Sequence, residues 1–444
     1  MARRSVLRIF WKGFYLLNWA LIGIFFLYGT LGSLSSEPSV VLLALGKLTG
    51  LIATYMVLTQ FFLMGRFPNL ERLWGLDGLS RFHQKNGRWS LLFLLLHPVL
   101  LTLGTAQISQ LGLLGQFKDF TFNYPYVLWA VIGIGLFFAV ILFSYSVVRL
   151  RLQYETWFSV HLLAYGAVFF SFWHQFESGT LLLTNKLFYG YWAALYIFVF
   201  GLHLIFRVLG PVYKYNRHKF RVARVVRETP STVSIYISGA HLDQFGVHPG
   251  QFMIVRFFTR NLLLQSHPFS LSMMPDGKEL RITVRELGDF TRQLQNVSAG
   301  TRVMIDGPYG VFTDLFSVSK KVLMIAGGIG ITPIRSLMEE MLAKGKDVVL
   351  LYGNRNEGDI VFRNELEQLA QKYSSRVIFV MSDQENFVGE KGKIDEEKIV
   401  RLVPDVTTRE VYLCGPVPMM EGLSRSLQGV GVQKDLIHYE KFAF

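Results

Sequence analysis

The first half of the chain consists of long apolar segments, and the second half of short alternating ones. Six apolar segments occupy roughly residues 10–31, 40–63, 88–106, 126–147, 157–176 and 187–208. A helix needs about 20 mostly apolar residues to cross the hydrocarbon core of a bilayer. The sequence therefore predicts a six-helix transmembrane domain over residues 1–210.

From about residue 219 the hydrophobic pattern becomes that of a soluble protein. Short segments with alternating apolar positions, separated by turn residues, predict a small antiparallel β-barrel over 211–318. Beyond it, buried strands alternate with amphipathic helices, which predicts an α/β domain with a parallel sheet over 319–444. The expected fold class is a multidomain membrane protein: a helical bundle, then a β-barrel, then an α/β domain.

Composition and charge refine this division. The 444 residues are 51% hydrophobic and carry a formal net charge of +13. Basic residues precede the first segment, lie between the second and third and between the fourth and fifth, and follow the sixth. The positive-inside rule therefore places both termini and the soluble domains in the cytoplasm. Because the charge lies largely on these flanks, it does not indicate nucleic-acid binding. The single cysteine, Cys414, excludes an internal disulfide and Cys-ligated clusters.

Four histidines stand in apolar surroundings at matching separations. His83 and His97 are fourteen positions apart, and His161 and His174 are thirteen apart. On a helix either separation is about 20 Å. Ionisable side chains are costly in a membrane and usually functional there, and neutral imidazole is a common axial ligand of haem iron. Because the third and fifth segments run in the same direction, we predict the pairs His83–His161 at the cytoplasmic depth and His97–His174 at the outer depth. Four unrelated polar residues lining a bundle are the alternative.

Three further residues qualify this prediction. Thirteen residues of an ideal helix turn through about 220°, so the fifth segment either has a bend, for which Gly166 is the candidate, or passes between the two haem macrocycles. Pro98 removes one helical hydrogen bond beside His97. His203 has no partner at a matching depth, and we interpret it as structural.

Three short pieces of the predicted barrel carry candidate cofactor contacts. Gly250 and Gln251 precede a strand, and Ser270 offers a hydroxyl at a strand end. Arg285 stands beside a glycine turn, and Thr291 is expected to begin a helix. A helix N-terminus with an arginine alongside is a good diphosphate site. Each piece alone is equally explained by capping.

The predicted α/β domain opens with a glycine turn between a buried strand and an amphipathic helix. Gly327, Gly328 and Gly330 let the backbone approach a ligand closely. Thr332 is expected to be the N-cap, with Pro333 at the first helical position. This is the arrangement that binds dinucleotide phosphates, although Pro333 replaces the third glycine of the usual fingerprint.

Later segments supply further candidates. Arg355 follows the next strand and can pair with a 2′-phosphate, which favours NADPH over NADH; a solvated loop arginine is the alternative. Cys414, Gly415 and Pro416 end a strand at the carboxyl edge, where open α/β sheets bind ligands. The sequence closes on HYEKFAF, whose last aromatic residue either stacks on a flat cofactor or docks on the sheet.

In this order and spacing, the segments resemble the transmembrane ferric reductase and NADPH oxidase family, and closely its compact bacterial NADPH oxidases. The resemblance covers nearly the whole chain. It implies FAD, two b-type haems and NADPH (or NADH) as cofactors, in a multi-pass protein of the bacterial inner membrane. The residues matching its haem ligands are His83, His97, His161 and His174. Those matching its flavin segments are His267, Pro268, Phe269, Ser270, Arg285, Gly288 and Thr291. Those matching its nucleotide segments are Gly327, Gly328, Gly330, Thr332, Pro333, Cys414, Gly415 and Pro416.

The same resemblance implies an aromatic residue over the flavin ring. Counted from Glu440 this is Phe442, with Phe444 as the competing candidate. Together with Ser270 and Cys414, these two are the expected catalytic residues.

The expected activity is hydride transfer from NADPH to FAD, followed by single-electron transfer through the haems to oxygen, which gives superoxide. Leu101 stands where some animal oxidases carry a further histidine, so Lys47 is the candidate for positive charge near the acceptor instead; a lysine that snorkels from a helix end is the alternative. A ferric-chelate reductase would use the same chain. A histidine-lined channel or transporter, and a quinone-linked subunit feeding a separate protein, are the competing hypotheses from different functional classes. No nucleic acid and no obligatory protein partner are expected.

Overall fold

The structure is a computed structural model that describes residues 2–33, 35–145, 154–263 and 265–439. It divides into two compact units, Met1–Phe67 with Leu79–Phe206, and Pro68–Gly78 with Arg207–Phe444. The first unit is helical, and the second contains all the described strands.

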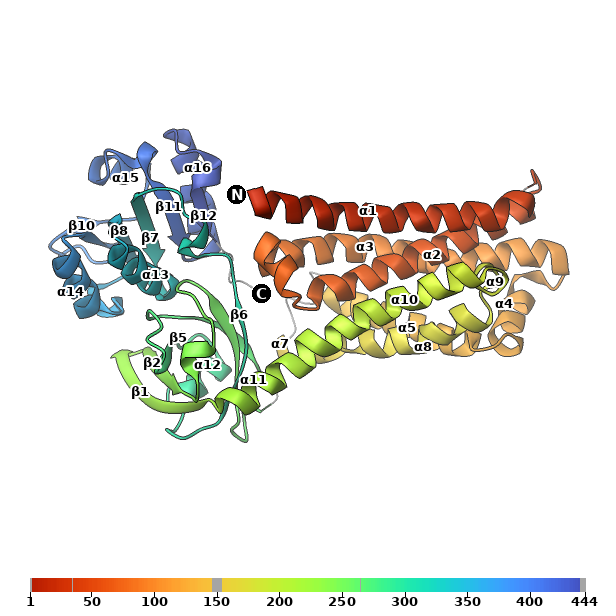
Figure 1. Cartoon of the computed structure of the whole chain (residues 1–444), viewed down its shortest axis with the longest axis horizontal. Coiled ribbons are helices and arrows are strands. Elements are labelled where there is room, and N and C mark those ends of the chain that lie inside the picture. Colours follow the sequence, from red (N-terminus) through yellow and green to blue (C-terminus); the bar gives the residue numbers. More distant parts are fainter. Residues whose placement is uncertain (1, 34, 146–153, 264, 440–444) are drawn as a thin grey trace. The chain divides into compact units, whose positions relative to one another are not determined.

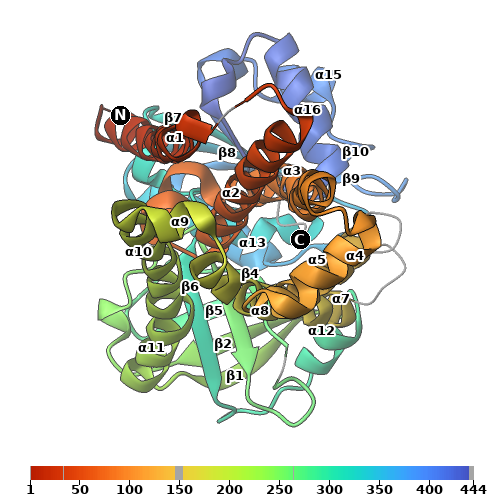
Figure 2. The same cartoon turned by 90° about the vertical axis from the view of Figure 1, so that its right-hand side faces the viewer.

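Helices that run side by side build the first unit (Figures 1 and 2). Its helices are α1 (Ala2–Thr30), α2 (Pro38–Met64), α3 (Pro68–Ser109), α4 (Gly112–Asn123), α5 (Val127–Ser144), α7 (Tyr154–His161), α8 (Leu163–Glu177), α9 (Thr180–Thr184) and α10 (Lys186–His203). Six helical stretches of the described chain are long and apolar enough to cross a membrane, which confirms the predicted spans: Val6–Ser33, Pro38–Met64, Pro68–Ser109, Val127–Ser144, Thr156–Glu177 and Lys186–His218.

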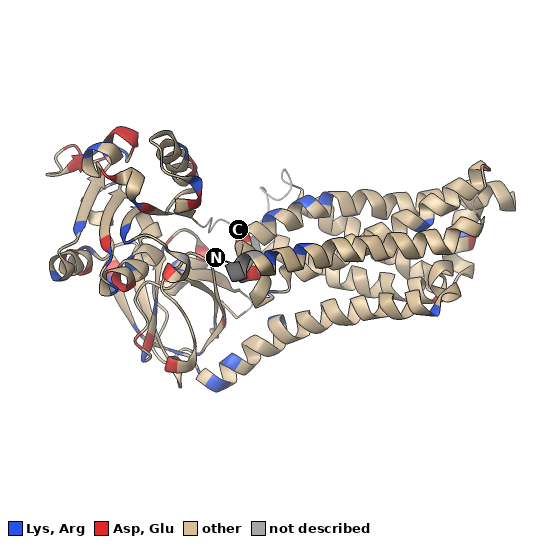
Figure 3. Ribbon diagram, turned by 45° about the horizontal axis from the view of Figure 1, so that its top comes forward, with Lys and Arg blue, Asp and Glu red and all other residues tan. Residues whose placement is uncertain are grey.

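The bundle is apolar on its inside and its outside. Ile22, Leu58 and Trp192 are fully buried in its core, whereas Tyr28 and Ile197 are more than 70% exposed. Figure 3 shows that charged residues are sparse along these helices and lie mainly toward their ends. An apolar outer surface is stable only against lipid, so the unit has the surface of a membrane protein.

Two helices of the bundle are interrupted. The fifth span breaks at Leu162, between α7 and α8, directly after His161. The bend expected at Gly166 is therefore wrong, since Gly166 lies inside α8. In α3 the interruption is at Gly75, whose φ of 69° is left-handed, whereas Pro98 is accommodated inside the helix. The sixth span also continues past residue 208, through a π-helical turn (Leu204–Leu209) into α11 (Gly210–His218).

The second unit contains two three-stranded antiparallel sheets. One has the order β1 (Arg221–Thr229), β2 (Thr232–Ser238), β5 (Glu279–Arg285); the other has β4 (His267–Ser270), β3 (Phe252–Phe257), β6 (Val303–Tyr309). Single bridges, Arg221 with Arg302 and Leu271 with Ile282, join the sheets at both edges. Apolar side chains of both sheets form one core. The antiparallel β domain predicted from alternation is confirmed as two sheets with a shared core.

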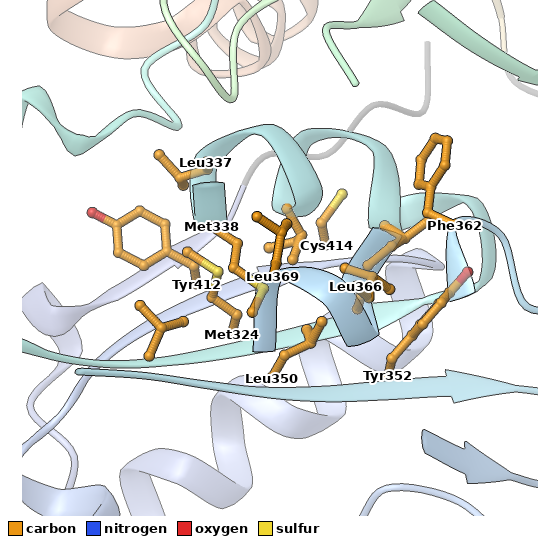
Figure 4. Packing of buried hydrophobic residues seen from close by; sticks show 14 of the residues in the cluster. Met324, Leu337, Met338, Leu350, Tyr352, Phe362, Leu366, Leu369, Tyr412 and Cys414 are labelled. Carbon is orange, nitrogen blue, oxygen red and sulfur yellow. The ribbon is translucent and has the colours of Figure 1, made fainter. Parts of the chain in front are cut away.

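A six-stranded parallel sheet follows, in the order β10 (Glu390–Lys391), β9 (Arg376–Met381), β8 (Asp347–Asn354), β7 (Lys321–Gly327), β11 (Glu410–Cys414), β12 (Ile437–Tyr439). Helices α13 (Ile331–Ala343) and α14 (Arg363–Tyr373) pack on one face, and α15 (Glu396–Leu402) and α16 (Val417–Gly429) on the other. Figure 4 shows the first of these cores, in which Leu337 and Met338 of α13 meet side chains of the sheet. The predicted α/β fold is confirmed.

Candidate functional site

The four bundle histidines lie together in the two predicted pairs. His83 of α3 faces His161 of α7, with ring centroids 6.0 Å apart. His97, further along α3, lies close enough to His174 of α8 for the two rings to interact electrostatically. Both pairs therefore join the third span to the fifth, at two levels of the bundle.

In two of these histidines, the Nδ1 atom lies within hydrogen-bonding distance of an oxygen atom. His97 Nδ1 lies 2.7 Å from the carbonyl oxygen of Gly46. His161 Nδ1 lies 3.2 Å from Ser144 Oγ, which donates its own proton to the Val140 carbonyl. Because a carbonyl can only accept, His97 Nδ1 carries the proton, which leaves its Nε2 lone pair available to a metal. His161 has the same tautomer when its Nδ1 donates to Ser144 Oγ.

The rings of the other two histidines are held less firmly by hydrogen bonds. The rings of His83 and His174 lie beside the backbone carbonyls of Gln60 and Ser171. Among the described residues, however, neither Nδ1 makes a hydrogen bond of normal geometry. These two carbonyls are therefore the candidate acceptors for His83 and His174, in positions like that of Gly46 beside His97.

Two glycines of α2 form the socket for His97. Gly46 and Gly50 are four residues apart, the spacing that lets transmembrane helices approach closely. A Cβ on Gly50 would lie 2.5 Å from His97 Nδ1, and one on Gly46 would lie 2.7 Å from Leu101 Cδ2. Sequence analysis missed this pair, although the GKLTG spacing could have revealed it.

The separation of His83 and His161 fits a metal held between two imidazoles, as haem iron can be. A metal held about 2 Å from two imidazole nitrogens leaves the ring centroids roughly 6 Å apart, as His83 and His161 are. No group of three or more His, Cys, Asp or Glu residues able to hold a metal occurs in the part of the chain that the structure describes. Two imidazoles suffice for haem iron, because the macrocycle supplies the remaining ligands.

The candidate flavin residues occupy adjoining strands of the antiparallel sheets. His267, Pro268, Phe269 and Ser270 form β4, which pairs with β3. Gly250 and Gln251 precede β3, and the carbonyl of Gln251 accepts the Leu271 amide at 2.9 Å. These two segments are therefore side by side. Gly250 has φ +84°, and a Cβ there would lie 1.9 Å from the Phe312 carbonyl oxygen, so the position requires glycine.

A short helix completes this region and corrects one prediction. Helix α12 (Asp289–Leu294) has Gly288 as its N-cap, so Thr291 is in the first turn and does not begin the helix. The Thr291 hydroxyl instead accepts the Leu287 and Gly288 amides. Phe290 packs against His267 with ring centroids 3.9 Å apart. The contact of Phe290 with His267 was not predicted, because nothing in the local sequence distinguishes Phe290 from an ordinary core residue.

Arg285 connects the flavin region with the glycine turn. A Cβ on Gly328 would lie 3.5 Å from Arg285 Nη1, and Arg285 Nη2 lies 3.9 Å from Asp359 Oδ1. Burial raises the pKa of Tyr352 on β8, and the positive charge of Arg285 opposes this effect. A cationic side chain therefore lies beside the backbone of the turn, where a diphosphate can be bound.

The glycine turn itself is shaped by a close approach to the end of β11. A Cβ on Gly330 would lie 2.3 Å from the Cys414 carbonyl oxygen, and one on Gly327 would lie 2.6 Å from Met419 Sδ. Gly328, with φ +53°, is the turn residue that needs a left-handed conformation. The carboxyl ends of β7 and β11 therefore meet, which brings Cys414, Gly415 and Pro416 next to the turn.

Two predictions at this edge, the N-cap at Thr332 and the first helical position of Pro333, are wrong. The N-cap of α13 is Gly330, so Thr332 is not the cap; its hydroxyl donates to the Ile329 carbonyl at 3.0 Å. Pro333 accordingly lies at the third helical position. Arg355 follows β8 directly and is exposed. Phe442 and Phe444 lie outside the described residues.

A segment at the start of α3 belongs to this second unit. Glu71, which is 3% exposed, accepts the Gly310 amide at 2.6 Å. Lys214 of α11 donates to the Gly307 carbonyl. Two elements continuous with membrane spans thus bind the end of β6. The carbonyl of Gly310, which follows β6, also accepts a hydrogen bond from Gln251 Nε2 at 3.3 Å. Sequence analysis gave no indication of this contact.

Comparisons with known proteins agree with the two halves of the chain. Residues 49–172 match the family "Ferric reductase like transmembrane component", residues 215–313 an "FAD-binding domain", and residues 324–425 the "Oxidoreductase NAD-binding domain". An FAD-binding β domain followed by a parallel nucleotide-binding sheet defines a ferredoxin–NADP reductase-like oxidoreductase. With the transmembrane component before it, the chain has the architecture of the NADPH oxidase and ferric reductase family.

Individual relatives resemble about half of the chain. The ferredoxin reductase component of a 3-ketosteroid-9-alpha-monooxygenase from Rhodococcus rhodochrous is 29% identical over 228 residues, 50% of this chain and 64% of the relative. A flavohemoprotein of Burkholderia sp. is 28% identical over 233 residues, 50% of this chain and 58% of the relative. The chain thus spans less than two thirds of these relatives. The structure "Ferredoxin reductase in carbazole 1,9a-dioxygenase" is 24% identical, with a TM-score of 0.46, over 51% of this chain and 69% of that one.

Proposed function

We propose that this protein transfers electrons from NADPH through FAD and two b-type haems across the membrane to oxygen, and that superoxide is released. The observation that carries the proposal is the pair of facing imidazoles, His83 and His161, with ring centroids 6.0 Å apart, in a bundle joined to an FAD- and nucleotide-binding unit. In this proposal the dehydrogenase part faces the cytoplasm of a bacterial inner membrane, as the basic flanks favour. Residues 211–318 are taken as its FAD-binding part and 319–444 as its nucleotide-binding part.

FAD supplies the exchange between a two-electron hydride and single electrons, and haem carries electrons one at a time. The protein positions these groups. Arg285 balances the charge of a diphosphate beside the turn at Gly328. Arg355 selects a 2′-phosphate. Ser270, at the end of β4, offers a hydroxyl hydrogen bond at the flavin edge.

The remaining assignments follow the same logic. Cys414 lies at the carboxyl edge of the sheet, where the nicotinamide binds in open α/β folds. The family resemblance assigns the flavin ring to Phe442, or alternatively to Phe444; both lie outside the part of the chain that the structure describes. In the bundle, Gly46 fixes the orientation of the His97 ring, so that its Nε2 faces the position of a metal.

Two acceptors are compatible with this arrangement. His83, His97, His161 and His174 would hold the haems, which would supply single electrons to either acceptor. Lys47 lies on α2 next to Gly46, which binds His97, and its charge can attract an anionic product. The match of residues 49–172 to the ferric reductase component favours the second candidate, in which a ferric chelate receives the electron.

One experiment tests both the proposed path of the electrons and the identity of the acceptor. Purified protein reconstituted with FAD and haem is given NADPH and cytochrome c in air, with and without superoxide dismutase, and His174→Leu is measured alongside. We expect dismutase to remove most of the cytochrome c signal. We expect His174→Leu to lose one haem and the signal, but to keep NADPH-dependent flavin bleaching. Electron flow that survives in His174→Leu would refute the proposed path of electrons through the two haems. If the rate is insensitive to dismutase and ferric chelates compete for it, the acceptor is the chelate and not oxygen.

A further inference from the structure

A network of charged and hydroxyl side chains connects the flavin sheets with the nucleotide-binding sheet; Arg281 and Ser336 are buried in it, and the side chain of Glu365 is 32% exposed. Arg281 of β5 is 3% exposed and forms two hydrogen bonds with Glu365 of α14, at 2.6 and 3.0 Å. Arg335 of α13 lies 2.8 Å from the same carboxylate through its Nε. Glu365 is therefore held between an arginine of the flavin region and an arginine of the helix that begins at the glycine turn.

The network also holds Arg281 from its own side. Its Nη2 donates to the Ser272 carbonyl at 2.6 Å, and its Nε to Ser272 Oγ at 3.2 Å. The guanidinium lies over the ring of Phe362, 4.4 Å from its centroid. A bidentate guanidinium–carboxylate pair that is also stacked and hydrogen-bonded has one geometry available, so it fixes direction as well as distance.

The charges in this network are balanced. Burial by itself raises the pKa of Glu365, but the hydrogen bonds and charges of Arg281 and Arg335 outweigh that effect and lower the pKa below its usual value. The Glu365 carboxylate therefore stays ionised at neutral pH. Glu339 pairs with Arg335 one turn along α13 and accepts the Met274 amide at 3.3 Å.

A second contact lies on the same face of α13. Ser336 is completely buried, and its hydroxyl lies 3.1 Å from the Gly250 amide and 2.8 Å from the Leu271 carbonyl. Those two residues flank Gln251 and Ser270 of the candidate flavin site. The opposite face of α13, with Leu337 and Met338, packs on the parallel sheet (Figure 4). One helix thus binds the nucleotide turn at its N-terminus, the sheet on one face and the flavin strands on the other.

From this geometry we infer that Glu365 and Ser336 are positioning residues for hydride transfer: they fix the glycine turn of the nucleotide site against the flavin strands through α13. The inference rests on the proposed function and adds residues that touch neither cofactor. Hydride transfer needs the reacting atoms about 3–3.5 Å apart, and a displacement near 1 Å can lower the rate roughly 100-fold. Loss of the network is therefore expected to slow the transfer more than it weakens NADPH binding.

The test compares Glu365→Gln with Glu367→Gln, which is two residues further along the same helix and removes only an exposed pair with Arg363. NADPH-dependent bleaching of the flavin is followed anaerobically in a stopped-flow instrument over a range of NADPH concentrations. For Glu365→Gln we expect the limiting rate to fall at least tenfold, with the half-saturating NADPH concentration changed less than threefold. Glu367→Gln should match the wild type, and Ser336→Ala should resemble Glu365→Gln.

Hydrogen–deuterium exchange provides a measurement that does not depend on turnover. In Ser336→Ala the Gly250 amide loses its acceptor, and peptides covering 248–257 should exchange faster while those of β8 and β9 do not change. Equal limiting rates in Glu365→Gln and Glu367→Gln would overturn the inference, as would an unchanged exchange pattern in Ser336→Ala. Wild-type protein whose bound flavin NADPH fails to bleach would instead refute the proposed function, so the two failures are distinguishable.

Discussion

Substitution of Gly50 by alanine tests whether the helix contact of α2 with α3 holds the candidate ligand His97 in place. The added Cβ would lie 2.5 Å from His97 Nδ1 and 2.7 Å from Cε1. Ordinary van der Waals contact begins at about 3.4 Å, so the ring must move by roughly 1 Å. That movement takes Nδ1 away from the Gly46 carbonyl, to which it now lies at 2.7 Å.

The cost of this change can be worked out in two parts. Overpacking in a closely packed interior costs about 1–3 kcal/mol, and the lost hydrogen bond adds about 1 kcal/mol. Together these give about 2–4 kcal/mol against the orientation in which Nε2 is presented. If that orientation is needed to hold haem, retention at this level should weaken roughly 30- to 1,000-fold.

Haem stoichiometry is the appropriate assay. The absorbance of dithionite-reduced, purified protein gives the number of haems per polypeptide, and we expect Gly50→Ala to fall from two toward one. Gly135→Ala is the matched control, because a Cβ there meets nothing within 4 Å, and it should keep both haems. Equal haem content in the two variants would refute the idea that the glycine socket holds His97 for a haem.

Two further predictions concern the second unit. Gly330→Ala puts a Cβ 2.3 Å from the Cys414 carbonyl oxygen and should lower the free energy of unfolding by about 1–3 kcal/mol, seen as a lower Tm and a higher NADPH requirement for flavin bleaching. Gly422→Ala, with open space around it, should change neither quantity. Identical behaviour of the two variants would contradict the packing described. Burial tends to raise the pKa of Glu410, but hydrogen bonds, led by the one from His438 at 2.6 Å, outweigh it and hold the pKa at about 2. Because the folded-state pKa is lowered, this stabilisation is present above about pH 4.5 and is lost as the pH falls toward 2. Glu410→Gln should therefore cost about 2 kcal/mol at pH 7 and progressively less below pH 4.5 in thermal unfolding, whereas a difference independent of pH would show that the charge is not responsible.

The architecture could be predicted from the sequence alone, because period and length are local properties. An apolar run of about 20 residues can be stable only in lipid, and strict alternation indicates a half-buried strand. The six spans, the barrel strands and the parallel sheet were therefore all predictable. The nearly equal separations within His83–His97 and His161–His174 also predicted which rings lie near each other, because helices in a bilayer are nearly parallel and depth follows residue number.

Contacts between distant segments depend instead on the tertiary structure. The break after His161 is at Leu162 and not at Gly166, since backbone geometry there depends on packing against other helices. Local rules also placed the caps wrongly at Thr291 and Thr332, because Gly288 and Gly330 occupy the cap positions and the threonine hydroxyls bond backbone within the first turn.

The largest gap concerns residues whose roles come from partners far away in sequence. Glu365 lies 84 residues from Arg281, and Ser336 lies 86 residues from Gly250; in one dimension both are ordinary helical residues. Ser336 and Arg281, the partner of Glu365, are buried, and a charge or hydroxyl removed from water must find a partner. Which partner it finds is decided by how the sheets and helices pack, and that is absent from any local pattern.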